Sequence, residues 1–492
     1  MRALPILLAL SLPAQELPAP PDLPTRIEAL LKDHPAVARA TWAISAVNLR
    51  TGEILYQHNP ATTFVPASNM KLYSTALALT RLGPNHRFAT RVYATAKPDA
   101  SGTLHGDLIL QGNGDPTLSG RELPYRKNGN WNDPLGPLDS LAGELAAQGI
   151  RRITGNIIGD DRAYVWEPFP PGWARDDTLY DYGAPVSALT LHDNFITLTF
   201  TPSAPGELAH VQVFPETGYF QLRNNVTTTA RGSNRIDEER AADPRTFHFT
   251  GTISRAASVF LALDDPARYA AHALKECLTR RGIAIDGEAR ALHRFPADSL
   301  VPAPEPGIKI AERQSTPLSE IVKVTNKVSQ NLHAEILMRE LARVRGKQGQ
   351  RRAALDELAT FLRGLGASPE DFAFYDGSGL SRLTLITPDL TMRLLRFMYT
   401  SENRQAWLDS LPIGGEDGTI GERFKGFRDG VVRAKTGTLS HCTSLSGYLE
   451  TNAGETIAFS MMANNANTNA AGIRGFFDKV VALLAAPPAN LQ

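Results

Sequence analysis

The sequence is poor in cysteine and carries no excess of charge of either sign. Its two cysteines, Cys277 and Cys442, are far apart in the chain, so a framework of disulfide bonds is excluded. The sequence does not decide whether they pair, but we expect both thiols to be free and buried. Lys plus Arg equals Asp plus Glu, at 51 each among 492 residues. No overall field would therefore draw the protein onto nucleic acid or anionic lipid, and the expected ligand is small and specific.

Motifs of several hydrolase classes are also missing. The chain has no His-Glu-x-x-His and no pair of Cys-x-x-Cys sequences, so a metallohydrolase is unsupported and we expect neither a metal nor a cofactor. It has no Gly-x-Ser-x-Gly, which a lipase-like hydrolase would need.

The hydrophobic run at the N-terminus is too short to cross a bilayer. It reads M-R-A-L-P-I-L-L-A-L-S-L-P-A-Q-E, with one positive residue, a brief apolar stretch and small residues near Ala14. This pattern predicts a signal peptide cleaved near Ala14 within a leader of residues 1–20, and hence an exported, periplasmic or cell-envelope protein with no integral membrane span. The alternative, a buried N-terminal helix, is disfavoured by Pro5 and Pro13.

The middle of the chain, residues 87–300, differs in pattern from both ends. Short alternating segments such as R-F-A-T-R-V-Y-A are separated by Gly, Pro and Asp turns, which predicts mostly β structure with its own core. The charged run at residues 231–245 is interpreted as a solvated loop. Because 492 residues exceed what one core usually supports, two or three domains are expected.

The two ends alternate strand and helix patterns. Residues 41–48 and 53–59 alternate like a hairpin, and from Leu318 apolar residues recur at intervals of three and four, as in helices. Strand patterns close the chain, followed by a helix at residues 473–484 whose apolar residues share one face. Packing on a sheet explains that face better than membrane anchoring, since its polar side lacks a basic cluster.

Ser68 and Lys71 open an apolar helix pattern in the stretch P-A-S-N-M-K-L-Y-S-T-A-L. One helical turn separates them, so the lysine amine can reach the serine hydroxyl. Lysine can remove that proton only if its pKa falls, which burial and neighbouring cations achieve. A helix-capping serine beside a surface lysine is the alternative, so this motif alone is weak evidence.

Two later elements strengthen the acylating interpretation. The strand V-V-R-A-K-T-G-T contains Lys435, Thr436 and Gly437, where a cation and a hydroxyl can meet a substrate carboxylate and glycine permits close backbone approach. An edge strand with a solvated lysine is the alternative. Ser329 and Asn331 lie at a break between two helical segments; the second Ser-x-Asn, at residues 401–403, is better explained as a turn.

Ser-x-x-Lys, Ser-x-Asn and Lys-Thr-Gly, in this order, are the signature of the penicillin-recognising serine acyltransferases. With the long insertion and D-G-S-G-L-S-R at residues 376–382, almost the whole mature chain resembles the D-alanyl-D-alanine carboxypeptidase/endopeptidase family of penicillin-binding protein 4 type. The resemblance implies an α/β fold: a serine β-lactamase/transpeptidase-like domain with an antiparallel sheet flanked by helices, formed by residues 21–86 and 301–486. Residues 87–300 would be a β-rich insertion of one or two smaller domains.

The resemblance also implies roles for the first two motifs. Ser68 would be acylated by the penultimate D-alanine of a peptidoglycan stem peptide, releasing the terminal D-alanine, and water would then free the enzyme. Lys71 would be the base, Ser329 would relay a proton to the leaving amine, and Asn331 would hold the substrate amide. Stem peptides and β-lactams are the expected ligands; the sequence gives no oligomeric state and no preference between carboxypeptidase and endopeptidase.

The third motif would bind the substrate carboxylate. Lys435 and Thr436 would steer and hold it beside Gly437, and the backbone N–H groups of Ser68 and Thr438 would form the oxyanion hole. We also expect Lys71, Lys435 and Lys327 to share a neighbourhood, in which clustered cations depress one another's pKa.

Asp177 and Arg382 are candidates for binding the stem peptide's third residue. Asp177 matches a family position thought to meet the amino group of that side chain, and Arg382 would meet its carboxylate. A loop aspartate in a turn and an arginine that braces a loop are the competing explanations. The family often has His-Asn or Arg-Asn after this arginine, whereas Leu383 and Thr384 stand here.

Two other functions are weighed against the carboxypeptidase. A β-lactamase would use the same acylation, but no Tyr-x-Asn, the usual second element of one such class, occurs in this chain. A non-catalytic module that binds cell-wall peptides predicts the loss of a motif residue, and none is lost.

Overall fold

The computed structural model describes residues 22–485 apart from residues 130, 132, 299–305 and 429. The predicted signal peptide and its cleavage near Ala14 lie outside the described residues. Within them, no helix combines the length and apolarity that a membrane span requires. Cys277 and Cys442 are both free and buried, which confirms the expectation for the thiols.

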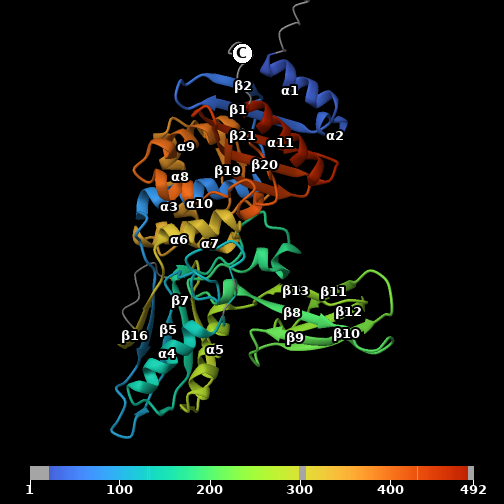
Figure 1. Cartoon of the computed structure of the whole chain (residues 1–492). Helices are drawn as coiled ribbons and strands as arrows, with labels where there is room; N and C mark the ends of the chain where they lie inside the picture. The colour runs from blue at the N-terminus through green and yellow to red at the C-terminus, as the bar shows by residue number, and fades with distance from the viewer. Residues whose placement is uncertain (1–21, 130, 132, 299–305, 429, 486–492) are drawn as a thin grey trace, which may run out of the picture.

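A five-stranded antiparallel sheet built from both ends of the chain forms the upper part of the molecule (Figure 1). Its strand order is β19-β20-β21-β1-β2. The strands are β1 (Thr41–Asn48), β2 (Ile54–His58), β19 (Gly430–Leu439), β20 (Cys442–Thr451) and β21 (Thr456–Asn464). The hairpin at residues 41–59 is present, but every residue of β1 after Thr41 is buried, because apolar layers cover both faces of this inner strand.

Helices cover both faces of this sheet. Trp42 and Ile44 belong to the apolar cluster of α1 (Leu23–Lys32) and α11 (Ala470–Ala485), whereas Ala43 and Val47 belong to the cluster on the other face. The predicted packing of the last helix on the sheet is confirmed, since Ile473, Phe476, Phe477 and Val480 are all buried in the first cluster. The second cluster includes α3 (Met70–Leu82), α7 (Asn331–Val344), α8 (Arg351–Gly364), α9 (Pro388–Thr400) and α10 (Arg404–Ser410).

Helix α3 lies inside the molecule rather than on its surface. Every residue from Met70 to Leu79 is buried, so the helix is enclosed on all sides by its neighbours, among them α6 (Leu318–Lys327) and α7. The α-helix begins at Met70, and Ser68 lies in the short 3₁₀ turn η1 (Ala67–Asn69) just before it. The serine side chain is therefore presented at the end of a rigid, buried element.

A second five-stranded sheet forms below the first, in the order β15-β7-β5-β3-β16. Helix α5 (Pro266–Arg280) packs on β7 and β15, and α4 (Gly136–Ala147) contacts α5. The strands are β3 (Ala89–Ala94), β5 (Leu108–Gln111), β7 (Ile157–Val165), β15 (Ala289–Arg294) and β16 (Ile308–Gln314), and a small parallel sheet joins β4 (Thr103–Leu104), β6 (Arg152–Ile153) and β14 (Ala284–Ile285).

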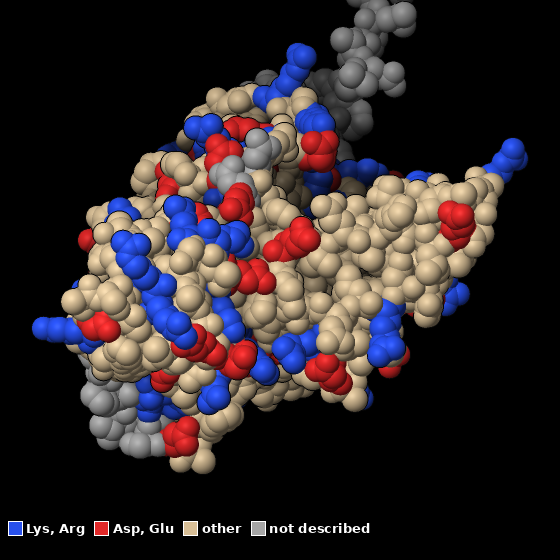
Figure 2. All heavy atoms as spheres, turned by 90° about the horizontal axis from the view of Figure 1, so that it is seen from below, with Lys and Arg blue, Asp and Glu red and all other residues tan. Residues whose placement is uncertain are grey.

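Two three-stranded sheets form a lobe that projects to one side of the molecule (Figure 1). One has the order β13-β8-β9 and the other β10-β12-β11. The strands are β8 (Phe195–Thr201), β9 (His210–Phe214), β10 (Gln221–Thr228), β11 (Arg235–Arg240), β12 (Thr246–Ile253) and β13 (Ala257–Ala262). Figure 2, the view from below, shows acidic and basic side chains interspersed rather than gathered by sign.

The interpretation of residues 231–245 as a solvated loop was wrong for its centre. Residues 235–240 form strand β11, which pairs antiparallel with β12 at the edge of its sheet. Side chains along β11 alternate between exposed and half-buried, so the charges remain in water while the backbone gains its ladder of hydrogen bonds. Charge alone therefore did not exclude a strand.

The second sheet and the side lobe share one apolar cluster that is separate from the two clusters of the upper sheet. Strand β16 pairs with β3 in the second sheet, although Ile308 follows the range 87–300 assigned to the insertion. We propose that the inserted unit extends to about Gln314, because a strand belongs with the sheet that satisfies its backbone hydrogen bonds.

Trp407 anchors the helices to the upper sheet, and its replacement tests that core. The side chain is fully buried, and its Nε1 donates a 2.9 Å hydrogen bond to Tyr448 Oη on β20. We expect Trp407→Ala to lower the free energy of unfolding by about 3–5 kcal/mol, measured by denaturant unfolding, because a large cavity is left. Ile54→Ala, at a position 57% exposed, is the control, with an expected change within about 0.5 kcal/mol. Equal effects of the two variants would contradict this account.

Candidate active site

The three sequence motifs converge at one end of α3. The turn η1 contacts β19 and β20, which brings Ser68 beside the strand that carries Lys435. Asn331 is the first residue of α7, which packs against α3, and Ser329 lies in the connection between α6 and α7. Residues separated by hundreds of positions in the sequence thus face one cleft.

Lys71 Nζ is the hub of the polar contacts in this cleft. It lies 2.9 Å from Ser68 Oγ, 2.5 Å from Asn331 Oδ1 and 2.8 Å from the backbone oxygen of Ser378. The lysine is fully buried. Three oxygen atoms therefore fix the amine against the serine hydroxyl, with water excluded from the lysine.

Burial lowers the pKa of Lys71 to about 7, although the nearby carboxylates of Asp376 and Glu335 favour its charged form. Burial, followed by the presence of Lys71, also holds the pKa of Lys435 well below its usual value. An amine with a pKa near neutrality is a competent proton acceptor under ordinary conditions. The arrangement can therefore remove a proton from Ser68 Oγ.

The expected cluster of three lysines contains only two. Lys327 Nζ instead lies 2.6 Å from Asp417 Oδ2 and 2.9 Å from the backbone oxygen of Leu411. Burial, rather than Lys71 or Lys435, is the main cause that lowers its pKa. The prediction was wrong for Lys327 because its side chain turns toward η6 (Gly418–Ile420) and the loop before it.

Ser329 and Lys435 form the opposite side of the cleft. Lys435 Nζ lies 2.8 Å from Ser329 Oγ and 2.8 Å from the backbone oxygen of Thr436. Ser329 has a left-handed backbone, with φ of 66°, which a serine adopts only when its surroundings enforce it. Asn331 Nδ2 donates to the backbone oxygen of Tyr182, so the inserted region also holds this motif.

Gly437 allows β19 to approach the serine turn. A Cβ atom there would lie 2.2 Å from Ser444 Oγ, 2.6 Å from the backbone oxygen of Pro66 and 3.0 Å from the backbone nitrogen of Ser68. No side chain fits in that space, so the close approach of the two backbones requires glycine.

A cavity of about 340 Å³ opens at this junction. Ser68, Ser329, Thr436, Gly437 and Thr438 line it, and so do two arginines, Arg423 and Arg474. Thr436 Oγ1 lies 2.8 Å from Thr419 Oγ1. Arg423 is paired with Asp478, and the hydroxyls together with Arg474 suit a carboxylate.

Sequence analysis did not assign the residues that support Lys71 from behind. Glu335 Oε1 accepts from the backbone N–H groups of Gly377 and Ser378, which aims the Ser378 carbonyl at Lys71. Burial, followed by Asp376, raises the pKa of Glu335 to about 7. Asp376 Oδ2 accepts from Trp173 Nε1 and from the Ser381 backbone. The signal available in the sequence was a glutamate inside an apolar helix pattern, where a charge needs a partner.

Asp177 and Arg382 lie in loops near the cleft rather than in direct contact with Lys71. Asp177 begins the turn η2 (Asp177–Leu179), and its Oδ2 accepts from the Ala174 backbone. Burial, followed by Asp177, raises the pKa of Tyr182 to about 12. Arg382 is exposed, and its Nη1 donates to the backbone oxygen of Ser440, just after β19.

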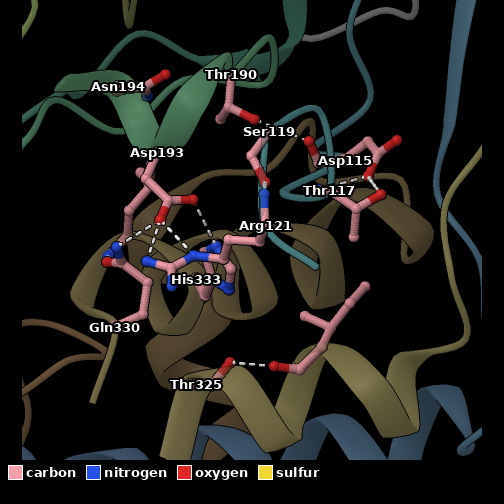
Figure 3. Close-up of polar contacts among 12 residues, drawn as sticks. Asp115, Thr117, Ser119, Arg121, Thr190, Asp193, Asn194, Thr325, Gln330 and His333 are labelled. Atoms are coloured by element: carbon pink, nitrogen blue, oxygen red, sulfur yellow. Dashed lines mark hydrogen bonds and ion pairs between the residues drawn. The ribbon is translucent and has the colours of Figure 1, made fainter. Parts of the chain in front are cut away.

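A buried carboxylate from the inserted region also escaped sequence analysis. Asp193 Oδ2 accepts from Arg121 Nε at 2.8 Å and from Gln330 Nε2 at 3.0 Å, and its Oδ1 lies 3.0 Å from His333 Nε2 (Figure 3). Gln330 is the residue between Ser329 and Asn331. Burial alone would raise the pKa of Asp193, but Arg121 and His333 outweigh it and lower the pKa.

Comparisons with known proteins identify the family. The profile of the "D-Ala-D-Ala carboxypeptidase 3 (S13) family" matches residues 23–485. A protein named D-alanyl-D-alanine carboxypeptidase from Actinomadura sp. (strain R39) is 36% identical over 459 residues, which cover 90% of this chain and 81% of the relative. D-alanyl-D-alanine carboxypeptidase DacB from Haemophilus influenzae is 26% identical over 439 residues, covering 86% and 85%.

A solved structure shows the same fold. Penicillin-binding protein 4 (dacB) from Haemophilus influenzae matches with a TM-score of 0.79 at 24% identity, covering 94% of this chain and 99% of that chain. A second structure of that protein, complexed with a β-lactam, matches with a TM-score of 0.75. The expected transpeptidase-like fold is thereby confirmed. The chain belongs to the D-Ala-D-Ala carboxypeptidase 3 (S13) family, as its three motifs predicted.

Proposed function

We propose that Ser68 Oγ is the nucleophile of this serine D-Ala-D-Ala carboxypeptidase and that Lys71 Nζ is its general base. The observation that carries the proposal is the 2.9 Å contact between these atoms in a site where Lys71 is fully buried. A serine hydroxyl needs a base within hydrogen-bond reach, and a neutral amine is such a base.

The first half of the reaction forms an acyl-enzyme. Ser68 Oγ attacks the carbonyl carbon of the penultimate D-alanine of a peptidoglycan stem peptide while its proton passes to Lys71 Nζ. The backbone N–H groups of Ser68 and Thr438 would stabilise the negative oxygen that develops, which the close packing of β19 on the serine turn supports. Asn331, held by Lys71 and the Tyr182 carbonyl, would bind the substrate amide.

Departure of the terminal D-alanine completes this first half, and hydrolysis of the ester is the second half. Ser329 Oγ, in contact with Lys435, would pass a proton to the leaving nitrogen as the C–N bond breaks and the terminal D-alanine departs. Water then attacks the ester, and Ser68 regains its proton. Lys435, next to Thr436 in β19, would donate to the terminal carboxylate of the substrate in the cavity that Thr436, Gly437 and Arg474 line.

Asp177 and Arg382 are proposed to bind the side chain of the stem peptide's third residue. Asp177 would meet its amino group and Arg382 its carboxylate. The contact of Asp177 with Tyr182, whose carbonyl holds Asn331, and that of Arg382 with Ser440, just after β19, support this assignment, since a carboxylate and a guanidinium suit a side chain with both charges.

Export of the chain is proposed from its N-terminal pattern together with its substrate class. The run before Ala14 resembles a signal peptide, and peptidoglycan lies outside the cytoplasmic membrane, so both observations favour export.

Acylation by benzylpenicillin tests the nucleophile. The β-lactam complex of the Haemophilus influenzae protein supports β-lactams as ligands here. We expect intact-mass analysis to show one stable adduct per chain, mapping to Ser68 and absent in Ser68→Ala, because the β-lactam carbonyl mimics the scissile amide. Ser74→Ala, which alters a serine within α3 itself, should retain the adduct. Rapid turnover without an adduct would indicate a β-lactamase, and an adduct at another residue would refute the assignment.

The pH dependence of acylation tests the base. Because the pKa of Lys71 is lowered to about 7, its neutral form is lost as the pH falls through that value. We expect the second-order acylation rate to be flat above about pH 8 and to fall about tenfold per pH unit below about pH 6, measured by stopped-flow with a reporter β-lactam.

Glu335 titrates in the same range, so it supplies the matched control. Glu335→Gln keeps an oxygen that can accept from Gly377 and Ser378. The fall in rate at low pH should persist in this variant with its midpoint moved to lower pH, because the Glu335 carboxylate favours the charged form of Lys71. Lys71→Arg keeps the charge but cannot act as a base, and it should not be acylated. A midpoint that disappears in Glu335→Gln would exclude Lys71 as the titrating group.

A further inference from the structure

A second cavity, of about 500 Å³, adjoins the active-site cleft. Ser329 lines both cavities, and residues 328–331 form one wall of the larger one. Its other walls come from the inserted region, with Tyr182, Phe195, Phe214 and Phe260 among them. The volume falls within the range of about 300–1,000 Å³ that is typical of small-ligand sites.

Aromatic rings dominate this second cavity and are open to solvent. Trp131, Tyr182, Phe214 and Phe260 are 41%, 43%, 42% and 44% exposed, and they come from four separate segments of the chain. Large apolar side chains that cluster on the surface often mark a binding site, whereas single exposed ones need no explanation. The cavity therefore offers ring faces to a ligand.

His192 adds an unsatisfied hydrogen-bonding group to the same cavity. Its side chain is buried, and among the described residues neither ring nitrogen has a hydrogen-bond partner. Burial lowers the pKa of His192 to about 4, so the imidazole is neutral, with one donor and one acceptor. Its ring packs edge-on to Trp131 at 4.8 Å between centroids.

The charged groups of this cavity lie beside groups of opposite charge. Arg121 is paired with Asp193, and its guanidinium lies 4.3 Å from the Trp131 ring centroid. Burial raises the pKa of Asp181. A neutral ligand with apolar faces and polar edges fits these walls better than an ion, and a pyranose ring has that character, because its C–H groups pack on aromatic faces while its hydroxyl and acetamido groups form hydrogen bonds.

We propose that this cavity binds an N-acetylated sugar of the glycan strand to which the stem peptide is attached. The proposal rests on the function proposed for Ser68. Three residues separate the sugar from the penultimate D-alanine and span roughly 10 Å when extended. A cavity that begins at Ser329 and continues into the side lobe suits that reach.

Two substrates that differ only in the sugar test this subsite. D-alanine release is measured from a stem pentapeptide attached to its disaccharide and from the same peptide without sugar. We expect the wild-type kcat/KM to be at least tenfold higher for the sugar-linked substrate, and Trp131→Ala to abolish most of that preference. Phe295→Ala, which removes an exposed ring outside the cavity, should leave the preference unchanged.

The possible failures are distinguishable. Equal wild-type kcat/KM values for the two substrates, or a preference that survives in Trp131→Ala, would overturn the sugar site while the peptidase function stands. If neither substrate is cleaved and benzylpenicillin leaves Ser68 unmodified, the proposed function itself fails, and the subsite with it.

A separate observation concerns how the Ser-x-Asn motif is held. His192, Asp193 and Asn194 are consecutive non-glycine residues with left-handed backbones, at φ of 52°, 52° and 58°. Each such residue is unfavourable, so the surroundings must enforce this turn. The turn places the Asp193 carboxylate against Gln330 (Figure 3). The Oε1 atom of Gln330 in turn accepts from the Leu332 backbone at the start of α7.

We infer that Asp193 is a positioning residue that fixes Ser329 and Asn331 through Gln330. Its side chain is fully buried and satisfied by Arg121, Gln330 and His333. Ser329 also has a left-handed backbone. The hydrogen bond between Gln330 and Asp193 therefore joins two strained turns, the one at residues 192–194 and the one at Ser329. Without the carboxylate, the Ser-x-Asn connection loses one of its anchors to the inserted region, and the hydrogen bond from Asn331 to the Tyr182 carbonyl remains.

Benzylpenicillin acylation rates test this role. We expect Asp193→Asn to slow acylation of Ser68 by roughly tenfold or more, because small displacements of positioned groups are costly. Asp161→Asn is the matched control: Asp161 is another buried carboxylate of the insertion, held by His293 and Ser187, and its loss should lower stability without slowing acylation.

A double-mutant cycle separates positioning from general destabilisation. Asp193→Asn and Gln330→Ala both disrupt the same contact, the hydrogen bond from Gln330 to Asp193. Their effects on the acylation rate should therefore not add. Additive effects, or slowing by Asp161→Asn in proportion to its loss of stability, would overturn the inference.

Discussion

The contact between the buried Lys71 amine and the Ser68 hydroxyl is the interaction on which the rest of the site depends. In water a lysine would be protonated and useless as a base, and only burial brings its pKa to about 7. That burial requires α3 to be enclosed by its neighbouring helices, α6 and α7 above all, so the helix cannot be a surface element. The large core of the upper part of the molecule thus stabilises the fold and also lowers the pKa of Lys71.

Close backbone approach is the second constraint. Gly437 leaves room for the serine turn against β19, and Gly379, with φ of 80°, lets its loop pass the backbone oxygen of Ala67. Both glycines permit contacts that any Cβ would block. The loop that contains Gly379 also brings the Ser378 carbonyl to Lys71, with Glu335 holding that loop in place. Packing of backbones therefore determines where the polar atoms meet.

The inserted region contributes to the site although its core is separate. Asn331 donates to the carbonyl of Tyr182, and Gln330 donates to Asp193. The buried Arg339 on α7 pairs with the half-buried Glu167 of the insertion. Charged pairs buried in this way are costly to break, because removing one partner leaves the other without compensation. The insertion is thus joined to the helices around the cleft by specific polar contacts, and its aromatic cavity continues the cleft beyond Ser329.

The sequence by itself determined the order of the three motifs, the family they indicate, the strands and helices at the two ends, and a β-rich middle. These follow from local periodicity and from residue types at fixed spacing, and both patterns can be read within a single segment of the chain. Strand β11 was missed because its pairing depends on β12, and Lys327 was misplaced because its partner Asp417 is 90 positions away. Only the tertiary structure decided the burial of Lys71, the support from Glu335 and Asp376, and the reach of Asp193 to Gln330. Each of these depends on which distant segments pack together, a property that no local pattern contains.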